Sequence, residues 1–351
     1  MKKAQKHSRS VSSPVDYSAL AECVSRFSSR RIVLFGDCVA DEFQFGEISR
    51  VSREAPVLIL RHREMHRVPG GGANAANNLA DLGAKVSLVS AVGADSAGDA
   101  LLDYLRAKRV DLSGVVRVKN WATPIKTRFL AGWPHTKHQQ VLRVDREPET
   151  RLPEEARNKL RKKLLELTRS ADGVAISDYG FGTADPELVS DALRKRKNLR
   201  ISTIDARQNL ERYAGSGLTS ATPNEPELEA LHHTAIGQDL DALERCGRET
   251  LTRMKLDALL VTRGRDGMAL FEPGKATVHI PVHGTDQAVD VTGAGDTVLA
   301  VFTLALACGG GALEAAHLAN IAGGLVVMKR GTATVRRQEL LAAIRADLTG
   351  S

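Results

Sequence analysis

Short apolar runs alternate with amphipathic helical segments along most of the chain, and this alternation constrains the fold more than any other feature. The apolar runs lie at residues 31–36, 86–92, 173–177, 200–205 and 257–262. Segments with the helical spacing of apolar residues lie between them, at roughly 73–83, 96–108, 153–169, 185–197 and 240–254. Buried strands that alternate with helices form a mostly parallel sheet with helices on both faces. The sequence therefore predicts an α/β fold of this kind.

Two stretches interrupt the alternation. Residues 43–69 and 113–147 are rich in Val, Ile, Thr and Arg, alternate partly between apolar and polar residues, and carry no helical pattern. We expect both to supply strands of a small β-sheet outside the main sheet, a candidate lid. Lys126, Arg128 and Arg143 in the second stretch suit a phosphate group. The alternative is that they are exposed edge-strand charges that block aggregation.

The composition argues against several classes of protein. Aromatic residues make up only 4% of the chain, which disfavours a stacking surface for single-stranded nucleic acid. The net charge of +7 is spread over helical segments, where solvated helix faces explain it. The four cysteines form no CxxC pair, which favours a reducing compartment, and no apolar run has the length of a membrane span. We therefore expect a cytoplasmic protein that binds neither nucleic acid nor membrane.

The N-terminal segment differs from the rest of the chain. Residues 1–14 are basic and polar without an apolar core, which is typical of a disordered tail rather than of a signal peptide. We expect residues 1–28 to form this tail and a lead-in helix, and residues 29–349 to form a single domain.

Polar residues follow several of the predicted strands. They include Asp37 with Asp41, Asp178, Asp205 with Arg207, Asn224 with Glu227, and the segment from Thr262 to Gly267. Ligands of parallel sheets bind outside the carboxyl ends of the strands. Because several such ends carry polar residues, we expect them to converge on one site.

The segment Asp290-Val-Thr-Gly-Ala-Gly-Asp-Thr297 combines an anion site with a base. Gly293, Ala294 and Gly295 enter an apolar helix at 298–308, so their backbone N–H groups and the helix dipole suit a phosphate. Asp296 is placed to take a proton from a hydroxyl that attacks a phosphoryl group. Taken alone, such a turn is more often only a tight connection between strand and helix.

Three further motifs each have a functional and a structural interpretation. The glycines of Pro69-Gly-Gly-Gly-Ala-Asn74 allow the backbone to approach a ligand closely, and Asn74 can hydrogen-bond to sugar hydroxyls. The alternative is that the segment is a flexible hinge and that Asn74 is an ordinary helix N-cap. Asn224 and Glu227 suit Mg²⁺, or form a capping box. The segment from Thr262 to Gly267 borders a nucleotide, or is a plain hairpin turn.

The order of these motifs resembles the ribokinase-like (PfkB-type) carbohydrate kinases over about residues 30–347. The motifs are Gly-Asp after the first strand, Gly-Gly-x-Ala-Asn, Asn-x-x-Glu, Thr-x-Gly-x-x-Gly and Asp-x-x-Gly-Ala-Gly-Asp. Within the family, the chain is most similar to the D-glycero-β-D-manno-heptose 7-phosphate kinases, on stretches at 49–57, 126–128, 139–145, 177–179, 211–213 and 326–332. The resemblance implies a ribokinase-like kinase domain over 29–349.

The resemblance also implies roles for the residues of the motifs. Asp296 is the expected general base, and the amides of Gly293, Ala294 and Gly295 the anion hole. Asp41, Gly71 and Asn74 are expected to hold sugar hydroxyls, with Lys126, Arg128, Arg143 and Asp178 on the sugar-phosphate side. Asn224 and Glu227 organise Mg²⁺ through water, and Asn224, Thr262, Gly264, Gly267 and Asn320 border ATP. Asp290 is the candidate for a monovalent cation such as K⁺, and the lid is expected to pair two subunits.

The expected reaction is phosphorylation of the anomeric hydroxyl of heptose 7-phosphate by Mg·ATP, for the synthesis of ADP-heptose and lipopolysaccharide core precursors. Two loops depart from the heptose kinases: Gly180-Phe-Gly182, where they carry a lysine, and Asp205-Ala-Arg207, where they carry Asp-Pro-Lys. Kinases of another sugar or sugar phosphate, such as fructose 6-phosphate or ribose, therefore stay open, as does a non-catalytic sugar-binding regulator. The segment 132–138 looks like an insertion, and the absence of a His-x-Gly-His motif predicts a kinase domain without a fused adenylyltransferase.

Overall fold

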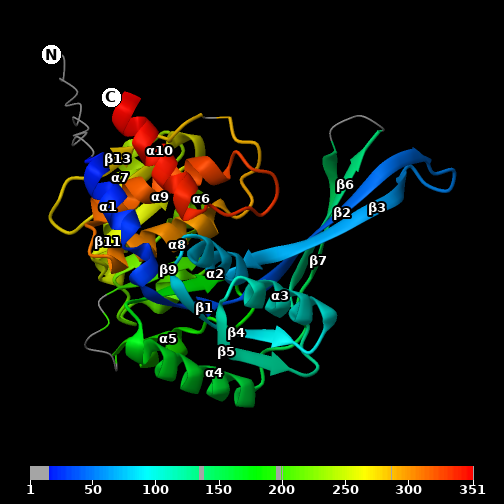
Figure 1. Cartoon of the computed structure of the whole chain (residues 1–351), viewed down its shortest axis with the longest axis horizontal. Helices are drawn as coiled ribbons and strands as arrows, with labels where there is room; N and C mark the ends of the chain where they lie inside the picture. Colours follow the sequence, from blue (N-terminus) through cyan, green and yellow to red (C-terminus); the bar gives the residue numbers. More distant parts are fainter. Residues whose placement is uncertain (1–15, 134–137, 195–198, 200, 286, 351) are drawn as a thin grey trace.

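The computed structural model describes residues 16–133, 138–194, 199, 201–285 and 287–350. The predicted tail and most of the 132–138 segment lie outside the described residues. The remaining elements form a body of helices around one large sheet, with a second sheet that projects from it (Figure 1).

The large sheet has nine strands. In spatial order they are β13 (Val278–Ile280), β12 (Met268–Phe271), β11 (Ala258–Thr262), β10 (Ser220–Ala221), β9 (Ser202–Ala206), β8 (Gly173–Asp178), β1 (Arg31–Gly36), β4 (Lys85–Gly93) and β5 (Asp111–Val118). All pairs from β11 to β5 are parallel, and β12 and β13 are added antiparallel. Each of the five predicted apolar runs overlaps one of these strands, so the mostly parallel α/β sheet is confirmed.

Two hydrophobic cores cover the two faces of this sheet. Along β1, Ile32 and Leu34 pack in one core, whereas Val33 and Phe35 pack in the other, because successive side chains of a strand point to opposite faces. Both faces of the sheet are therefore buried. This is why the predicted strands are continuous apolar runs and do not alternate between apolar and polar residues.

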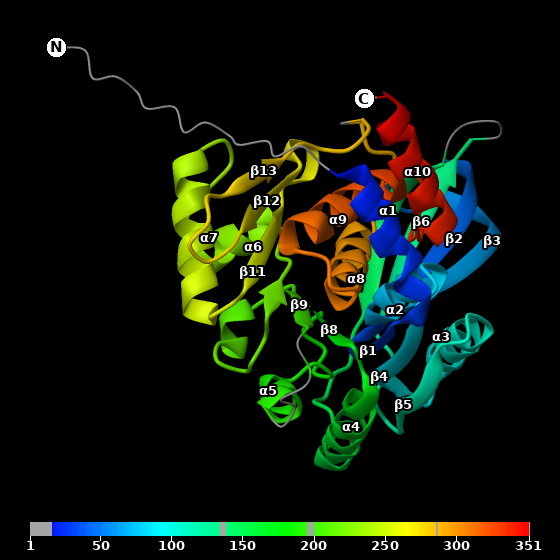
Figure 2. The same cartoon turned by 60° about the vertical axis from the view of Figure 1, so that its left-hand side comes forward.

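The helices divide between these two cores (Figure 2). The first core contains residues of α1 (Tyr17–Ser25), α2 (Gly72–Asp81), α3 (Ser96–Ala107), α8 (Ala294–Ala307), α9 (Ala312–Val326) and α10 (Arg337–Gly350). The second contains residues of α4 (Glu154–Leu167), α5 (Pro186–Arg194), α6 (Glu225–His232) and α7 (Leu240–Met254). Short 3₁₀ turns are η1 (Phe27–Ser29), η2 (Thr168–Ser170), η3 (Leu210–Tyr213) and η4 (Gly264–Asp266).

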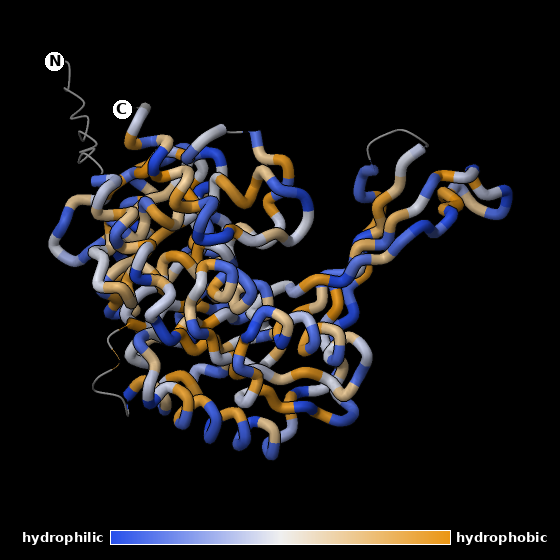
Figure 3. The backbone as a smooth tube through the Cα atoms, in the orientation of Figure 1, coloured by the Kyte–Doolittle hydropathy of each residue, from blue (hydrophilic) through white to orange (hydrophobic). Residues whose placement is uncertain are grey.

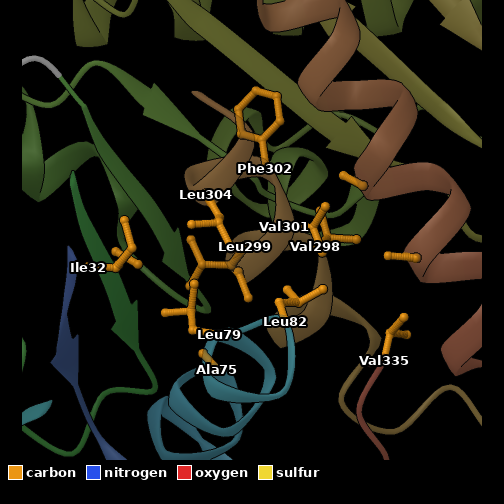
Figure 4. Close-up of a cluster of buried hydrophobic side chains, with 14 of the residues drawn as sticks. Ile32, Ala75, Leu79, Leu82, Val298, Leu299, Val301, Phe302, Leu304 and Val335 are labelled. Atoms are coloured by element: carbon orange, nitrogen blue, oxygen red, sulfur yellow. The ribbon is translucent and has the colours of Figure 1, made fainter. Parts of the chain in front are cut away.

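Helix α8 lies at the centre of the first core. Leu299 from α8 packs beside Leu79 and Leu82 from the region of α2, and Val301 and Phe302 belong to the same core (Figure 4). Ten consecutive residues of α8, from Asp296 to Ala305, are buried, so the start of this helix is held rigidly by the core. A site built on that helix terminus consequently has a fixed position.

The second sheet corresponds to the predicted lid. Its spatial order is β3 (Leu58–Gly71), β2 (Cys38–Val51), β6 (Ile125–Gly132) and β7 (Gln139–Arg146), with β2 and β6 parallel and the two outer pairs antiparallel. The sheet extends away from the body, and apolar and polar residues are interspersed along it (Figures 1 and 3). Every residue of β7 is exposed, so this outer strand presents an open edge.

One part of the lid prediction is wrong. The residues from 113 to 118 lie in β5, the edge strand of the large sheet, which pairs only with β4. In β5, Val116 and Val118 are buried while Ser113 and Arg117 are exposed. An edge strand that is buried on one side shows the same partial alternation as a lid strand, so the pattern could not separate the two.

Among the described residues, no helix combines the length and the apolar content needed to cross a bilayer.

Candidate active site

The start of α8 is a strained turn that only glycine accommodates. Gly293 is the N-cap of α8 and has a φ of 80°. A Cβ atom at Gly293 would lie 2.6 Å from Nδ2 of Asn74, so this turn needs glycine for space as well as for conformation. The helix ladder begins with Thr297 N–H, which donates to the Gly293 carbonyl at 3.1 Å. The N–H groups of Gly295 and Asp296 precede this ladder, whereas that of Ala294 already donates to the Val291 carbonyl at 3.2 Å.

Asp296 is a buried carboxylate in the first turn of α8. Its side chain is 1% exposed. Oδ2 accepts a hydrogen bond from Nδ2 of Asn74 at 2.8 Å, and Oδ1 accepts one from the hydroxyl of Tyr179 at 3.0 Å. Burial raises the pKa of Asp296 to about 7, although the two hydrogen bonds lower it. A carboxylate with a pKa near neutral pH is well suited to accept a proton during a reaction.

Asn74 supports Asp296 rather than capping a helix. The N-cap of α2 is Gly71, and its backbone stands at a φ of 55°, so the structural alternative of Asn74 as an N-cap is wrong. Asn74 lies within α2, is fully buried, and donates its side-chain N–H to Asp296. Its predicted contact with sugar hydroxyls stays a prediction.

A cavity of about 790 Å³ opens in front of Asp296. Predicted site residues from eight separate segments line it, namely Asp41, Gly71, Lys126, Arg128, Arg143, Asp178, Asn224, Glu227, Thr262, Gly264, Gly293, Ala294, Gly295 and Asp296. The expected convergence at the carboxyl ends of the strands is therefore observed. Asn74 lies behind this cavity, and Gly267, Asn320 and Asp290 line adjoining pockets.

On the lid side of the cavity, Asp41 is held in place by two partners. Arg128 on β6 places Nη1 2.5 Å from Oδ1 of Asp41 on β2, and the hydroxyl of Thr332 donates to Oδ2 at 2.7 Å. Lys126 lies directly opposite Asp41 in the β2–β6 register. The pKa of Lys126 is lowered by burial and by the nearby Arg207 guanidinium. The site therefore brings two cations close together, which favours an anion between them.

The other two residues predicted on this side have protein partners of their own. Arg143, on the exposed strand β7, bonds to Asp145 at 2.9 and 2.8 Å. Asp178, at the end of β8, accepts the hydroxyl of Tyr213 at 2.7 Å, and burial raises its pKa. Both side chains line the cavity, and their binding roles stay predictions.

Acidic residues from outside the lid strands, Asp205 and Glu227 among them, also line the cavity. Asn224 and Glu227 form the capping box of α6, with reciprocal hydrogen bonds of 2.8 Å, so the structural alternative is realised. Glu227 still lines the cavity, and the pKa of Asp205 is raised well above its ordinary value by burial and by the charge of Glu227. A buried carboxyl whose pKa is raised by a neighbouring carboxylate is a place where a divalent cation is stabilising.

The residues present suit Mg²⁺, which keeps bound water, better than they suit a metal ion whose ligands all come from the protein. Among the described residues, no group of three or more His, Cys, Asp and Glu side chains is arranged to hold a metal ion. Mg²⁺ usually keeps several waters and binds through one or two carboxylates together with substrate phosphates. Glu227 and Asp205 can supply that number of carboxylates.

A narrower pocket of about 180 Å³ joins the cavity on the far side of the α8 terminus. It shares Thr262, Gly264, Ala294 and Gly295 with the cavity and is otherwise lined mainly by apolar and small residues. Gly267, with a φ of 79°, forms one wall, and a Cβ there would lie 2.0 Å from the Ile280 carbonyl oxygen. The segment from Thr262 to Gly267 is thus both a turn between antiparallel strands and the edge of a slot suited to a flat ring.

Asn320 and Asp290 shape the surroundings of this pocket. Asn320, on α9, lines the slot and donates Nδ2 to the Pro281 carbonyl at 2.8 Å. Asp290 accepts the backbone N–H groups of Thr292 and Gly331 at 2.9 and 2.8 Å. These bonds tie the segment before α8 to the turn at Gly331, and the role of Asp290 toward a cation stays a prediction.

Three residues that contribute to the site were given no role from the sequence, although Asp205 and Arg207 were expected near it as polar residues at the end of a strand. Tyr179 bonds to Asp296, Asp205 faces Glu227, and Arg207 lies near Lys126. Tyr179 and Arg207 directly follow β8 and β9, and Asp205 is the next-to-last residue of β9, so the position at the carboxyl end of a strand is the signal that all three share.

The chain is similar to known proteins both in sequence and in fold. Residues 29–338 match the profile of the pfkB family carbohydrate kinases. The chain is 37% identical to the bifunctional protein HldE of Desulfatibacillum aliphaticivorans, over 92% of this chain and 64% of that protein. It is 39% identical to the bifunctional protein HldE of Geobacter metallireducens, over 89% of this chain and 62% of that protein. The chain thus spans less than two thirds of the length of these relatives.

Solved structures with the same fold include two sugar kinases. Ribokinase of Arabidopsis thaliana, complexed with ribose and ATP, has a TM-score of 0.67 and 21% identity over 90% of this chain and 99% of its own. Phosphofructokinase-2 of Escherichia coli, in complex with substrates and products, has a TM-score of 0.74 and 20% identity. The match covers 90% of this chain and 99% of that one. These similarities confirm the ribokinase-like fold. The chain therefore belongs to the pfkB family and is an ATP-dependent carbohydrate kinase.

Proposed function

We propose that this kinase transfers the γ-phosphate of ATP to the anomeric hydroxyl of D-glycero-β-D-manno-heptose 7-phosphate, giving the 1,7-bisphosphate for ADP-heptose and lipopolysaccharide core precursors. The observation that carries the proposal is Asp296, which lies buried at the start of α8 and lines one cavity together with Lys126, Arg128 and Glu227. The sequence resemblance to the heptose 7-phosphate kinases supports the substrate, and bifunctional HldE proteins are among the relatives.

In the proposed reaction, the base of ATP occupies the 180 Å³ slot and its phosphates extend to the start of α8. The free N–H groups of the first helical turn, with the helix dipole, stabilise negative charge on the transferred phosphoryl group. Asp296 accepts the proton of the anomeric hydroxyl as that oxygen attacks the phosphorus. Glu227, Asp205 and Asn224 would hold Mg²⁺, partly through water, and the ion would neutralise phosphate charge.

The distal phosphate of the sugar is proposed to lie on the lid side. Lys126 is buried, lines the cavity and has a second cation, Arg207, close by. A phosphate dianion there would relieve the repulsion between these two cations. Arg128 acts mainly through Asp41, whose carboxylate it holds ready for a sugar hydroxyl.

Further properties are proposed with this function. The exposed edge of β7 carries Val141, Leu142 and Val144, with exposed fractions of 45%, 55% and 49%, and an apolar edge of this kind suits pairing of two lids in a homodimer. A monovalent cation near Asp290 and a cytoplasmic location complete the proposal.

The variant Asp296→Asn tests the mechanism. General-base assistance is worth ~10²–10⁴-fold in rate, so we expect turnover to fall by that factor while calorimetry still detects binding of ATP and sugar phosphate. Asp103→Asn, on an exposed helix face, is the matched control and should keep full activity. Turnover close to the wild-type value in Asp296→Asn would remove Asp296 as the base.

A substrate panel tests the acceptor. ADP release is measured with Mg·ATP and heptose 7-phosphate, fructose 6-phosphate, ribose or fructose. Turnover on heptose 7-phosphate alone supports the proposal, whereas preference for another sugar keeps the kinase and changes its substrate. Tight sugar binding without turnover on any of the four would favour the regulator.

A further inference from the structure

Tyr179 contacts the carboxylate that is proposed as the base. It follows β8 directly, and its hydroxyl donates to Oδ1 of Asp296 at 3.0 Å. Asn74 donates to the other oxygen, Oδ2, at 2.8 Å. Each oxygen therefore has one donor from the protein and keeps acceptor capacity for a substrate hydroxyl. With both oxygens bonded, the carboxylate plane cannot rotate freely.

The surroundings hold the Tyr179 side chain in this position. Its backbone N–H donates to Oδ2 of the buried Asp37 at 2.9 Å. The Lys126 ammonium lies 4.8 Å from the ring centroid, and the Arg207 guanidinium lies 5.8 Å from it. A Cβ at Gly71 would come within 3.3 Å of the ring, which shows how closely the backbone at the start of α2 approaches it. The hydroxyl is consequently directed at Asp296 by contacts on several sides.

We propose that Tyr179 is a positioning residue for phosphoryl transfer: its hydroxyl holds the Asp296 carboxylate in one orientation and in its ionised form. The inference rests on the proposed function, because it assumes that Asp296 accepts the proton. It goes beyond that function by assigning Tyr179, which no motif singled out as a site residue, to the reaction.

The charges around Asp296 explain why a hydroxyl donor is needed. Burial is the largest cause that raises the pKa of Asp296, and Asp41 on β2 raises it further. Asp205 on β9 adds a third carboxyl, since it and Asp296 repel each other. Against these act the hydrogen bonds from Asn74 and Tyr179 and the positive charge of Lys126 on β6.

Tyr179 remains a donor throughout the working range of pH. Burial and the charge of Asp296 raise its pKa well above the ordinary value, so the phenol stays protonated. Without this donor, more of Asp296 would be protonated at neutral pH and unable to act as a base.

The test is the pH profile of kcat/KM for Tyr179→Phe, which keeps the ring and its contacts with Lys126 and Arg207. Loss of one hydrogen bond to the ionised carboxylate should move the acidic limb up by about one pH unit. At pH 6 we then expect kcat/KM to be about tenfold lower than in the wild type, and at pH 9 lower by less than about twofold. The phosphate of the substrate titrates equally for both proteins, so the comparison removes its contribution.

Tyr104→Phe on α3 is the matched control, and its pH profile should coincide with that of the wild type. An unchanged acidic limb in Tyr179→Phe, or an equal loss of activity at every pH, would overturn the proposal, because a purely structural role does not shift a titration. The side-chain carboxyl of Asp296 can also be titrated by ¹³C NMR, with Asp296→Asn to assign the signal. That titration should shift upward in Tyr179→Phe even if the variant has little activity.

The two hypotheses fail separately. If Asp296→Asn retains turnover, the proposed function fails. If Asp296→Asn is inactive but Tyr179→Phe titrates like the wild type, only the role of Tyr179 fails.

Discussion

Replacing Asp296 with asparagine should change how the stability of the protein depends on pH. Burial raises the pKa of Asp296 from 3.8 to about 7 in the folded protein, whereas the unfolded chain returns it to its ordinary value. A carboxyl whose pKa is raised by folding contributes stability that is complete below the unfolded pKa. This contribution is lost as the pH rises through the folded pKa. The wild type should therefore lose stability between about pH 4 and pH 7 on account of this residue.

The size of the loss follows from the shift in pKa. In the window between the two pKa values, each pH unit costs about 1.4 kcal/mol, and the slope vanishes above the folded pKa. Between pH 5 and pH 8 the free energy of unfolding of the wild type should fall by roughly 2 to 3 kcal/mol relative to Asp296→Asn. Asparagine does not titrate, so any constant effect of the substitution cancels in this comparison, as do groups that titrate alike in both proteins.

Urea unfolding followed by circular dichroism, at pH 5, 6, 7 and 8, measures this difference. The control is Asp103→Asn, an exposed position whose difference from the wild type should stay flat over the same range. A difference between wild type and Asp296→Asn that varies by less than about 0.5 kcal/mol would refute the reasoning, because a shift of the stated size cannot be silent.

Three further substitutions follow from the geometry of the site. Gly293→Ala should lower kcat at least about tenfold, because its Cβ would displace Asn74 from Asp296, the proposed base. Glu227→Gln keeps an acceptor for the helix cap and should raise the Mg²⁺ concentration for half-maximal activity about tenfold or more. Lys126→Ala should raise KM for the sugar phosphate far more than KM for ATP, because Lys126 lies on the lid side of the cavity.

Each of these expectations has a result that contradicts it. Gly274→Ala is the control for Gly293→Ala: its φ of 70° imposes the same backbone strain, but no atom lies within 4 Å of the added Cβ. Equal losses of kcat in the two variants would point to backbone strain alone. Unchanged Mg²⁺ activation in Glu227→Gln would remove that residue from the cation site. Equal effects of Lys126→Ala on both KM values would indicate a role in folding.

The apolar runs made the large sheet predictable because a strand covered on both faces needs apolar side chains at every position. The start of α8 was predictable for a similar reason. A positive φ and close backbone approach leave little choice but glycine at Gly293, and an acid in the first helical turn stands out beside it. Such features depend only on residues that are neighbours in the chain, so they can be predicted from the sequence.

The pairing of side chains could not be predicted. Asn74 and Asp296 are 222 residues apart, and Tyr179 and Asp296 are 117 apart, so nothing local relates them. The assignment of residues 113–118 to the lid failed for the same reason. An exposed edge in either sheet has the same alternation, and only the partner strand tells the two apart.

By itself, therefore, the sequence determined the α/β class, the turn at the start of α8 and the polar residues at the ends of the strands. The tertiary structure decided which of those residues meet: Asn74 and Tyr179 both bond to Asp296, Arg128 bonds to Asp41, and Glu227 lies close enough to Asp205 to raise its pKa. The physical reason is that backbone conformation follows from neighbours in the chain, whereas hydrogen bonds and charge interactions depend on distances that exist only after the sheet has assembled. Burial acts in the same way, because the pKa of Asp296 rises to about 7 only inside the folded protein.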